Sequence, residues 1–121
     1  MEIEVNRRGD SEVAVISSDS IVIAGLQDAL DVMVNLRYSG YEKMVLRKEH
    51  LLDDFYELRT GIAGEILQKY TNYGMKIAIV GDFSGYNSKS LNDFIYECNR
   101  GNRVFFKATE AEALDALHGV A

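Results

Sequence analysis

The sequence predicts a single α/β domain over residues 1–121, built on one mixed, mostly parallel sheet of about five strands with helices on its faces. Three observations predict this fold. Residues 1–16 show the alternation of a strand hairpin. After residue 25, short apolar stretches alternate with longer segments of helical period. The run Met75–Val80 is almost wholly apolar, which is typical of a central strand covered on both faces.

The chain begins with two short strands. Ile3 and Val5 alternate with polar residues, turn-forming residues follow at 6–10, and residues 13–16 form a second apolar stretch. Two such strands joined by a short turn pair antiparallel. The hairpin therefore supplies the antiparallel edge of an otherwise parallel sheet.

The next segments alternate between helix and strand. Residues 17–24 have no clear period, whereas residues 25–38 place apolar side chains at helical spacing and Gly40 ends that helix. Residues 44–46 form a short buried strand. Two helices are then predicted before the central strand, over His50–Leu58 and over Gly61–Tyr73.

The C-terminal third continues the same alternation after a polar loop over residues 82–90. Its predicted elements are a helix that Ser88 or Ser90 caps and Gly101 stops, a strand over 103–106, and a last helix whose capping box is Thr109 and Glu112. The predicted order is thus β-β-α-β-α-α-β-α-β-α. Strands joined through helices should be parallel, with right-handed crossovers.

Composition excludes several classes of function. The net charge of −6 argues against a protein that binds nucleic-acid phosphates, and we predict no nucleic-acid partner. Cys98 is the only cysteine, so no internal disulfide can form, and a cytoplasmic location is expected. Residues 1–9 do not resemble a signal peptide. No apolar run approaches the ~20 residues of a membrane helix, so no membrane association is predicted.

Two polar turns are predicted to lie on the same edge of the sheet. The turn 59–61 opens a predicted helix, and the loop 82–90 follows the predicted central strand. In parallel α/β folds, ligands bind beyond the carboxyl ends of the strands. The loop also exceeds the usual strand-to-helix connection of about 2–6 residues, which favours a functional role. The candidate ligand- or partner-binding residues are Arg59, Thr60, Gly61, Asp82, Ser84, Ser88 and Lys89.

Both turns also have an ordinary structural interpretation. Thr60 can simply cap its helix, which is a common role for threonine. The loop 82–90 can be a long solvated turn that ends in a helix cap. It is not a phosphate-binding Walker A loop, because Ser88 stands where that motif has glycine before Lys89.

No metal, cofactor or catalytic residue is predicted. Four polar residues, His50, Asp53, Asp54 and Glu57, have the spacing of metal ligands on one helix face, but any amphipathic surface helix shows the same pattern. Cys98 falls in the apolar stripe of its helix, which indicates a packing group rather than a nucleophile.

Three segments resemble a bacterial family known only as a domain of unknown function. They are F-Y-E-L-R-T-G-I-A-G-E-I-L-Q-K-Y at 55–70, I-V-G-D-F at 79–83 and S-K-S-L-N-D-F-I-Y-E at 88–97. The resemblance covers nearly the whole chain and implies no assigned activity. The order of elements also resembles STAS domains, the anti-sigma-factor-antagonist type. That likeness implies a partner-binding surface, although Arg59 stands where those domains have their phosphorylated serine, with Thr60 next to it.

The leading functional hypothesis is a non-catalytic, cytoplasmic binding or regulatory module that uses the edge formed by the 59–61 turn and the 82–90 loop. Its partner would be a protein or a small anionic ligand. The alternative is a small enzyme or binder for a phosphorylated metabolite or nucleotide, in which Arg59 and Lys89 hold the anion and Asp82 acts as a base or metal ligand. A third hypothesis is an oligomeric component, with Tyr41 and Tyr86 at an interface.

Overall fold

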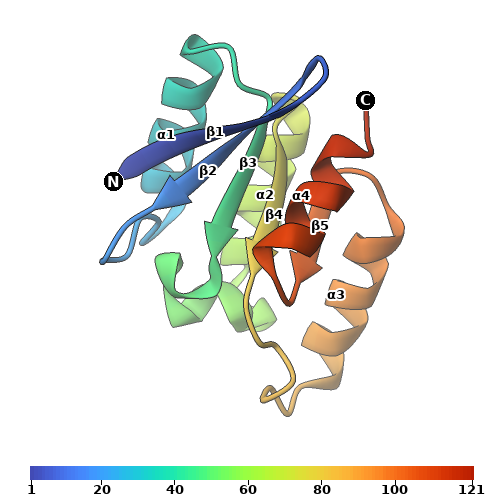
Figure 1. Cartoon of the computed structure of the whole chain (residues 1–121). Helices are drawn as coiled ribbons and strands as arrows, with labels where there is room; N and C mark the ends of the chain where they lie inside the picture. The colour runs from blue at the N-terminus through green and yellow to red at the C-terminus, as the bar shows by residue number, and fades with distance from the viewer.

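The computed structural model describes all residues from 1 to 121. It confirms the α/β fold, with one five-stranded sheet and four α-helices (Figure 1). The strands are β1 (Glu2–Arg8), β2 (Ser11–Ser17), β3 (Lys43–Arg47), β4 (Lys76–Val80) and β5 (Val104–Lys107). The helices are α1 (Leu26–Tyr38), α2 (Ile62–Asn72), α3 (Lys89–Arg100) and α4 (Glu110–His118).

The strands lie side by side in the order in which they occur along the chain. β1 and β2 form the predicted antiparallel hairpin, and β2, β3, β4 and β5 are parallel neighbours. Each parallel connection runs through a helix, because the chain must return to the end of the sheet where the previous strand began before the next parallel strand can start. β1 is therefore an edge strand, and β4 is central, as its apolar sequence predicts.

Side chains that alternate along the strands divide the core between the two faces of the sheet. Ile77 and Ile79 join the larger cluster, which packs against α1 and α2 and the start of α3. Ala78 and Val80 join the smaller cluster beneath α4. On this face α4 is the one helix that packs on the sheet, and it contacts β2, β3, β4 and β5. Three helices thus cover one face and one helix covers the other (Figure 1). No helix has both the length and the apolar composition needed to cross a membrane.

Most predicted element ends are confirmed. The Ser88 hydroxyl accepts a hydrogen bond from the Leu91 amide at 3.2 Å and begins α3. The Thr109 hydroxyl likewise accepts from the Glu112 amide at 3.2 Å and begins α4. These caps depend only on neighbouring residues, which explains why the sequence alone predicts them.

The predicted helix over His50–Leu58 is wrong. The chain forms three short 3₁₀ turns there instead, at Lys48–His50, Asp53–Tyr56 and Leu58–Thr60. The backbone carbonyl of His50 accepts from the amides of Val22 and Ile23, at 2.8 and 2.9 Å. These long-range bonds hold the segment against residues 17–24 and compete with a continuous helix.

Candidate functional site

An open groove lies at the carboxyl end of the sheet, between the 3₁₀ turns that follow β3 and the loop that follows β4. It has a volume of about 1030 Å³. This end is the lower part of the molecule in Figure 1. We call it the edge groove, and its lining residues are Asp53, Asp54, Tyr56, Glu57, Leu58, Arg59, Tyr86, Asn87, Ser88 and Ser90.

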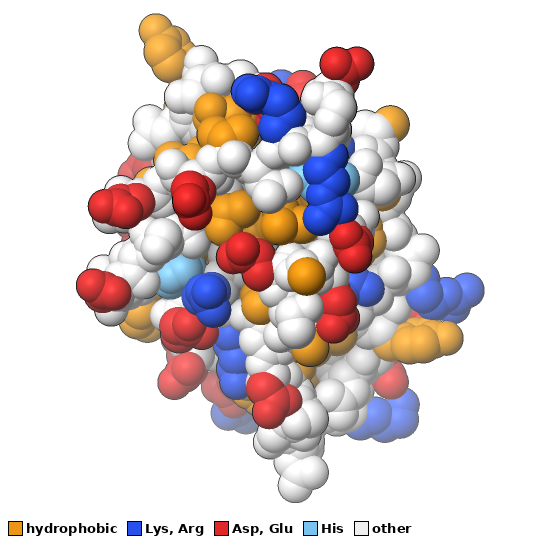
Figure 2. Space-filling view, viewed as in Figure 1, with side chains coloured by type: hydrophobic (Ala, Val, Ile, Leu, Met, Phe, Trp, Pro, Cys, Tyr) orange, Lys and Arg blue, Asp and Glu red, His pale blue; other side chains and the backbone are white.

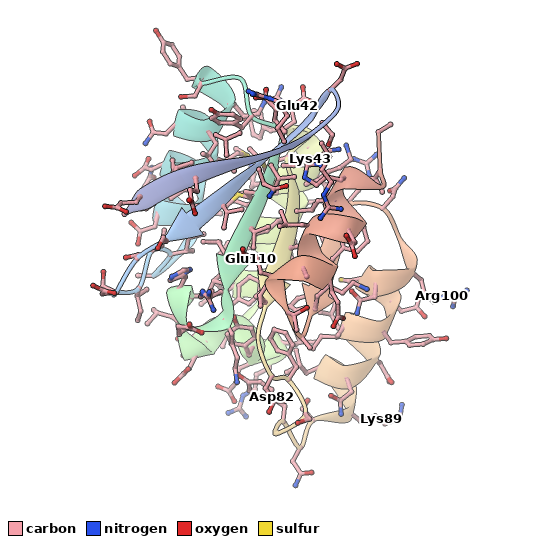
Figure 3. All side chains as sticks on the ribbon, in the orientation of Figure 1. Glu42, Lys43, Asp82, Lys89, Arg100 and Glu110 are labelled. Carbon is pink, nitrogen blue, oxygen red and sulfur yellow. The ribbon has the colours of Figure 1, made fainter.

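Two of the seven candidate binding residues, Arg59 and Ser88, line the edge groove. Asp82 and Lys89 lie at the same end of the molecule but outside that lining (Figure 3). Thr60, Gly61 and Ser84 are also absent from the lining. The two predicted turns therefore meet at one groove. The part that each candidate residue plays in binding stays a prediction.

Thr60 and Gly61 shape the backbone between the last 3₁₀ turn and α2. The Thr60 hydroxyl lies 2.9 Å from the Asp54 carbonyl oxygen and 2.8 Å from that of Glu57, and it accepts from the Ile62 amide at 3.3 Å. Gly61 has a φ of 78°, a left-handed conformation that favours glycine. Both residues thus have a structural role in the turn. The Thr60 hydroxyl bonds to neighbouring backbone groups, and Gly61 supplies the left-handed backbone conformation.

The two cations predicted to hold an anion are each paired with a carboxylate. Arg59 lies 3.0 Å from Glu57, and Lys89 lies 2.6 Å from Asp93, which raises the pKa of Lys89. These exposed pairs are weak. Even so, they reduce the positive charge that either side chain presents to an anionic ligand.

Asp82 is likewise occupied within its own loop. Its carboxylate accepts from the backbone amide of Ser84 at 2.9 Å and from the Ser84 hydroxyl at 2.6 Å. These hydrogen bonds lower the pKa of Asp82, because they stabilise the charged form. A carboxyl group held ionised in this way is a poor general base, since efficient bases have a pKa near the working pH.

The walls of the edge groove differ in charge. The wall from the 3₁₀ turns carries three carboxylates, those of Asp53, Asp54 and Glu57, with Arg59 beside them. The wall from the loop carries neutral polar groups, those of Asn87, Ser88 and Ser90. The groove therefore has an acidic wall and a neutral hydrogen-bonding wall, an arrangement that attracts cations.

Aromatic rings form the floor of the groove. Tyr56 is buried, its hydroxyl donates to the Lys48 carbonyl at 2.8 Å, and its ring stacks on Tyr86 with centroids 5.6 Å apart. Phe83 lies 6.0 Å from the Tyr56 ring and 5.3 Å from Phe106. Burial raises the pKa of Tyr56, so its hydroxyl stays protonated and keeps the bond to Lys48.

Lys48 joins the two sides of the groove and was not among the predicted site residues. Its ammonium group donates to the Asp82 carbonyl at 3.0 Å and lies 4.6 Å from the Tyr86 ring centroid, a cation–π contact. A Cβ at Gly81 would lie 2.5 Å from the Lys48 Cβ, so only glycine permits this approach. The signal in the sequence was its position one residue after β3, at the same edge of the sheet as the loop.

The residues with metal-ligand spacing do not form a metal site. His50 is buried, and both ring nitrogens are bonded: Nδ1 accepts from the Arg47 amide at 3.0 Å and Nε2 lies 3.1 Å from the Ser18 carbonyl oxygen. Asp53 and Asp54 are exposed. No group of three or more histidine, cysteine, aspartate and glutamate side chains could hold a metal ion.

Cys98, Tyr41 and Tyr86 are all half-buried. Burial raises the pKa of the Cys98 thiol to about 11, so little thiolate exists near neutral pH and the thiol is a poor nucleophile. The two tyrosines pack against the larger core cluster. Their burial leaves less surface for an oligomer interface than two exposed rings would supply.

A second polar cluster lies at the opposite end of the sheet from the edge groove, beside a cavity of about 340 Å³. His118 lies 2.8 Å from the Ser11 hydroxyl through Nδ1 and 2.8 Å from the Asn6 side-chain oxygen through Nε2. Lys43 donates to the same hydroxyl at 3.0 Å and to the Val120 carbonyl at 2.7 Å. Figure 3 shows Lys43 far from Asp82. The cluster ties the hairpin and the C-terminal segment to β3.

Protonation of His118 is expected to destabilise the protein. Burial and the nearby cations Arg8 and Lys43 lower the pKa of His118, against an opposing effect of Asp115. The stabilising contribution is complete above the unfolded value of about 6.5 and is lost as the pH falls toward the lower folded value, because the unfolded chain takes up the proton first. The effect should be modest, since the side chain is half-exposed.

Urea unfolding at pH about 7.5 and about 5.5 measures this effect. His118→Gln should show a smaller loss of unfolding free energy between these pH values than the wild type. An equal loss in both proteins would show that other groups cause the acid sensitivity.

Comparison with curated proteins finds no match to this chain. The model of one protein family matches residues 8–117, from the end of β1 to the last turn of α4. The match includes both walls of the edge groove. The chain therefore belongs to the family described as Domain of unknown function (DUF4180).

Proposed function

We propose that this protein is a non-catalytic binding module, with a regulatory role, that uses the edge groove to hold a basic segment of a partner protein. The observation that carries the proposal is the acidic wall formed by Asp53, Asp54 and Glu57 above a floor of tyrosine rings. Carboxylates attract lysine and arginine side chains, whose apolar stems can pack along apolar surface.

The residues of the groove support binding over catalysis. The lining includes no histidine, lysine or cysteine. Its carboxylates are exposed, and the one buried polar group, the Tyr56 hydroxyl, is bonded to the backbone. Nucleophilic catalysis needs a nucleophile within hydrogen-bond reach of a base, and no such pair lines the groove.

An anionic ligand, such as a phosphorylated metabolite or nucleotide, is the other candidate. Arg59 is the only cation in the lining, and it is paired with Glu57. Three carboxylates would repel a phosphate at close range. The charge of the lining therefore supports a basic partner over an anionic ligand.

Removal of two carboxylates from the acidic wall tests the proposal. Fluorescence anisotropy should detect a labelled lysine- and arginine-rich peptide that binds the wild type at low salt. We expect Asp53→Asn/Asp54→Asn to weaken binding about tenfold, because each exposed charge pair is worth about 0.2–1 kcal/mol. Asp19→Asn/Asp31→Asn removes the same charge from exposed positions outside the groove and should change the affinity much less.

Equal loss in both double variants would contradict a site in the groove and indicate attraction by net charge alone. A thermal-shift screen with inorganic phosphate and nucleotides examines the alternative. Stabilisation by such an anion that is lost in Arg59→Ala would favour the anionic ligand.

A further inference from the structure

We propose that two copies of this chain associate through β1, which pairs antiparallel with β1 of the second copy and joins the two sheets into one. The inference is separate from the proposed function, because it uses the opposite side of the fold from α3 and no residue of the edge groove. The occupant of the β1 edge in this proposal is a second copy of the same chain.

The first observation is that the outer edge of β1 is open. β1 is the last strand of the sheet and pairs only with β2. It is seven residues long, and every residue except Asn6 is exposed. An edge strand of this kind presents a row of unpaired backbone amide and carbonyl groups, which another strand can satisfy.

The second observation is an uncovered apolar stripe on the strand. Ile3 and Val5 lie opposite Ile16 and Ala14 of β2, on the face that α1 and α2 cover further along the sheet. Yet Ile3 is 42% exposed and Val5 is 40% exposed. A second strand beside β1 would remove part of this apolar surface from water.

The third observation is that the charges of β1 complement themselves in one orientation. The strand begins with Glu2 and Glu4 and ends with Arg7 and Arg8. Figure 2 shows acidic side chains at the left, where β1 begins, and basic side chains closer to its other end. An antiparallel pair centred on Val5 places Glu2 opposite Arg8 of the second copy, and all seven residues of each strand are paired.

Other arrangements are less favourable. A parallel pair in register places each charge opposite an identical charge, which destabilises the pairing. An antiparallel pair shifted so that Glu4 lies opposite Glu4 of the second copy brings two carboxylates together and shortens the overlap. The charge pattern thus favours an antiparallel pair over a parallel one, and centring it on Val5 gives the full overlap of seven residues.

Contacts within one copy do not block this pairing. Arg7 pairs with Glu12, and Arg8 lies 2.7 Å from Asp115. Both arginines remain substantially exposed, at 66% and 47% of the side chain. A guanidinium group has five donors, so Arg8 can keep its bond to Asp115 and also donate to Glu2 of the second copy, whereas Arg7 lies opposite Ile3 and keeps its present partner.

A charge exchange tests the interface by sedimentation velocity over the micromolar range. Glu2→Lys/Glu4→Lys makes β1 wholly basic, and Arg7→Glu/Arg8→Glu makes it wholly acidic. The wild type should dimerise. Each variant alone should associate at least about tenfold more weakly, and an equimolar mixture should recover a mixed dimer. The control variant Arg100→Glu/Arg103→Glu makes the same change of charge as Arg7→Glu/Arg8→Glu but far from β1. It should leave the dimer intact.

Recovery in the mixture also shows that both variants are folded, since unfolded chains would not restore a specific dimer. A wild type that stays monomeric throughout the range would overturn the proposal. So would a dimer that survives both changes, or a mixture in which no dimer forms.

A cross-link gives an independent measurement. In the proposed register the two Val5 residues face each other, and opposite Cα atoms in antiparallel strands lie about 4.5–5.5 Å apart, within the range of a disulfide. Val5→Cys in a Cys98→Ser background should yield a covalent dimer on mild oxidation. Glu65→Cys, on α2 away from β1, should not. Cross-linking at equal rates from both positions would contradict the β1 interface.

Discussion

Replacement of Tyr70 by alanine is expected to lower the free energy of unfolding by about 3–5 kcal/mol, the usual cost of removing a large buried ring. Tyr70 on α2 is fully buried, and its hydroxyl donates to the Ala29 carbonyl of α1 at 2.8 Å. The ring thus packs in the larger core and joins the two helices that cover the same face of the sheet. Urea unfolding monitored by circular dichroism measures the loss.

Tyr70→Phe separates the hydrogen bond from the packing. This variant keeps the ring and should cost only about 0.5–1.5 kcal/mol, the net value of one hydrogen bond, with some further cost for the Ala29 carbonyl left without that donor. If Tyr70→Phe cost as much as Tyr70→Ala, the hydroxyl would dominate and the packing explanation would be wrong.

Replacement of His50 by alanine is expected to cost about 2–5 kcal/mol and to loosen the acidic wall of the edge groove. The ring accepts from the Arg47 amide and lies within hydrogen-bond distance of the Ser18 carbonyl, so its loss leaves a cavity and two backbone groups without partners. His50 also belongs to the 3₁₀ turn that carries Lys48, whose carbonyl holds the Tyr56 hydroxyl. Damage at His50 should therefore reach the groove floor.

Hydrogen exchange locates this effect. The amides of Val22 and Ile23 bond to the His50 carbonyl. In His50→Ala the exchange rates of these two amides should therefore increase more, relative to the wild type, than those of the α4 amides. His50→Asn places an oxygen near the position of Nδ1, retains the bond to Arg47 and should lose less stability. A uniform increase in exchange over the whole chain would instead indicate global destabilisation without a local role for His50.

Local patterns in the sequence determined most of the framework. Ile3 and Val5 alternate with polar residues and indicated the hairpin, and the apolar run that became β4 indicated a central strand. Ser88 and Thr109 predicted the beginnings of α3 and α4, because a cap is a contact between residues three apart. The carboxyl ends of adjacent parallel strands share one edge, which is why the 59–61 turn and the 82–90 loop could be placed together.

Contacts between distant residues decided the rest. The spacing of Leu51 and Phe55 resembles a helix, but hydrogen bonds from residues 22 and 23 to His50 favour 3₁₀ turns there. The hydrophobic periodicity of a segment cannot predict such bonds, because the bonded residues are far apart in the sequence.

The character of the edge groove also depended on tertiary structure. Lys48 reaches the 82–90 loop, Tyr56 and Tyr86 stack to form the floor, and Arg59 pairs with a neighbouring carboxylate. The sequence shows that these groups exist and roughly where they lie. Only the folded chain decides which charges remain open to a ligand, because ion pairs and burial depend on distances that the order of residues does not specify. The sequence by itself thus determined the sheet and the edge at which the two polar turns meet, and the tertiary structure decided that the groove at this edge has an acidic wall.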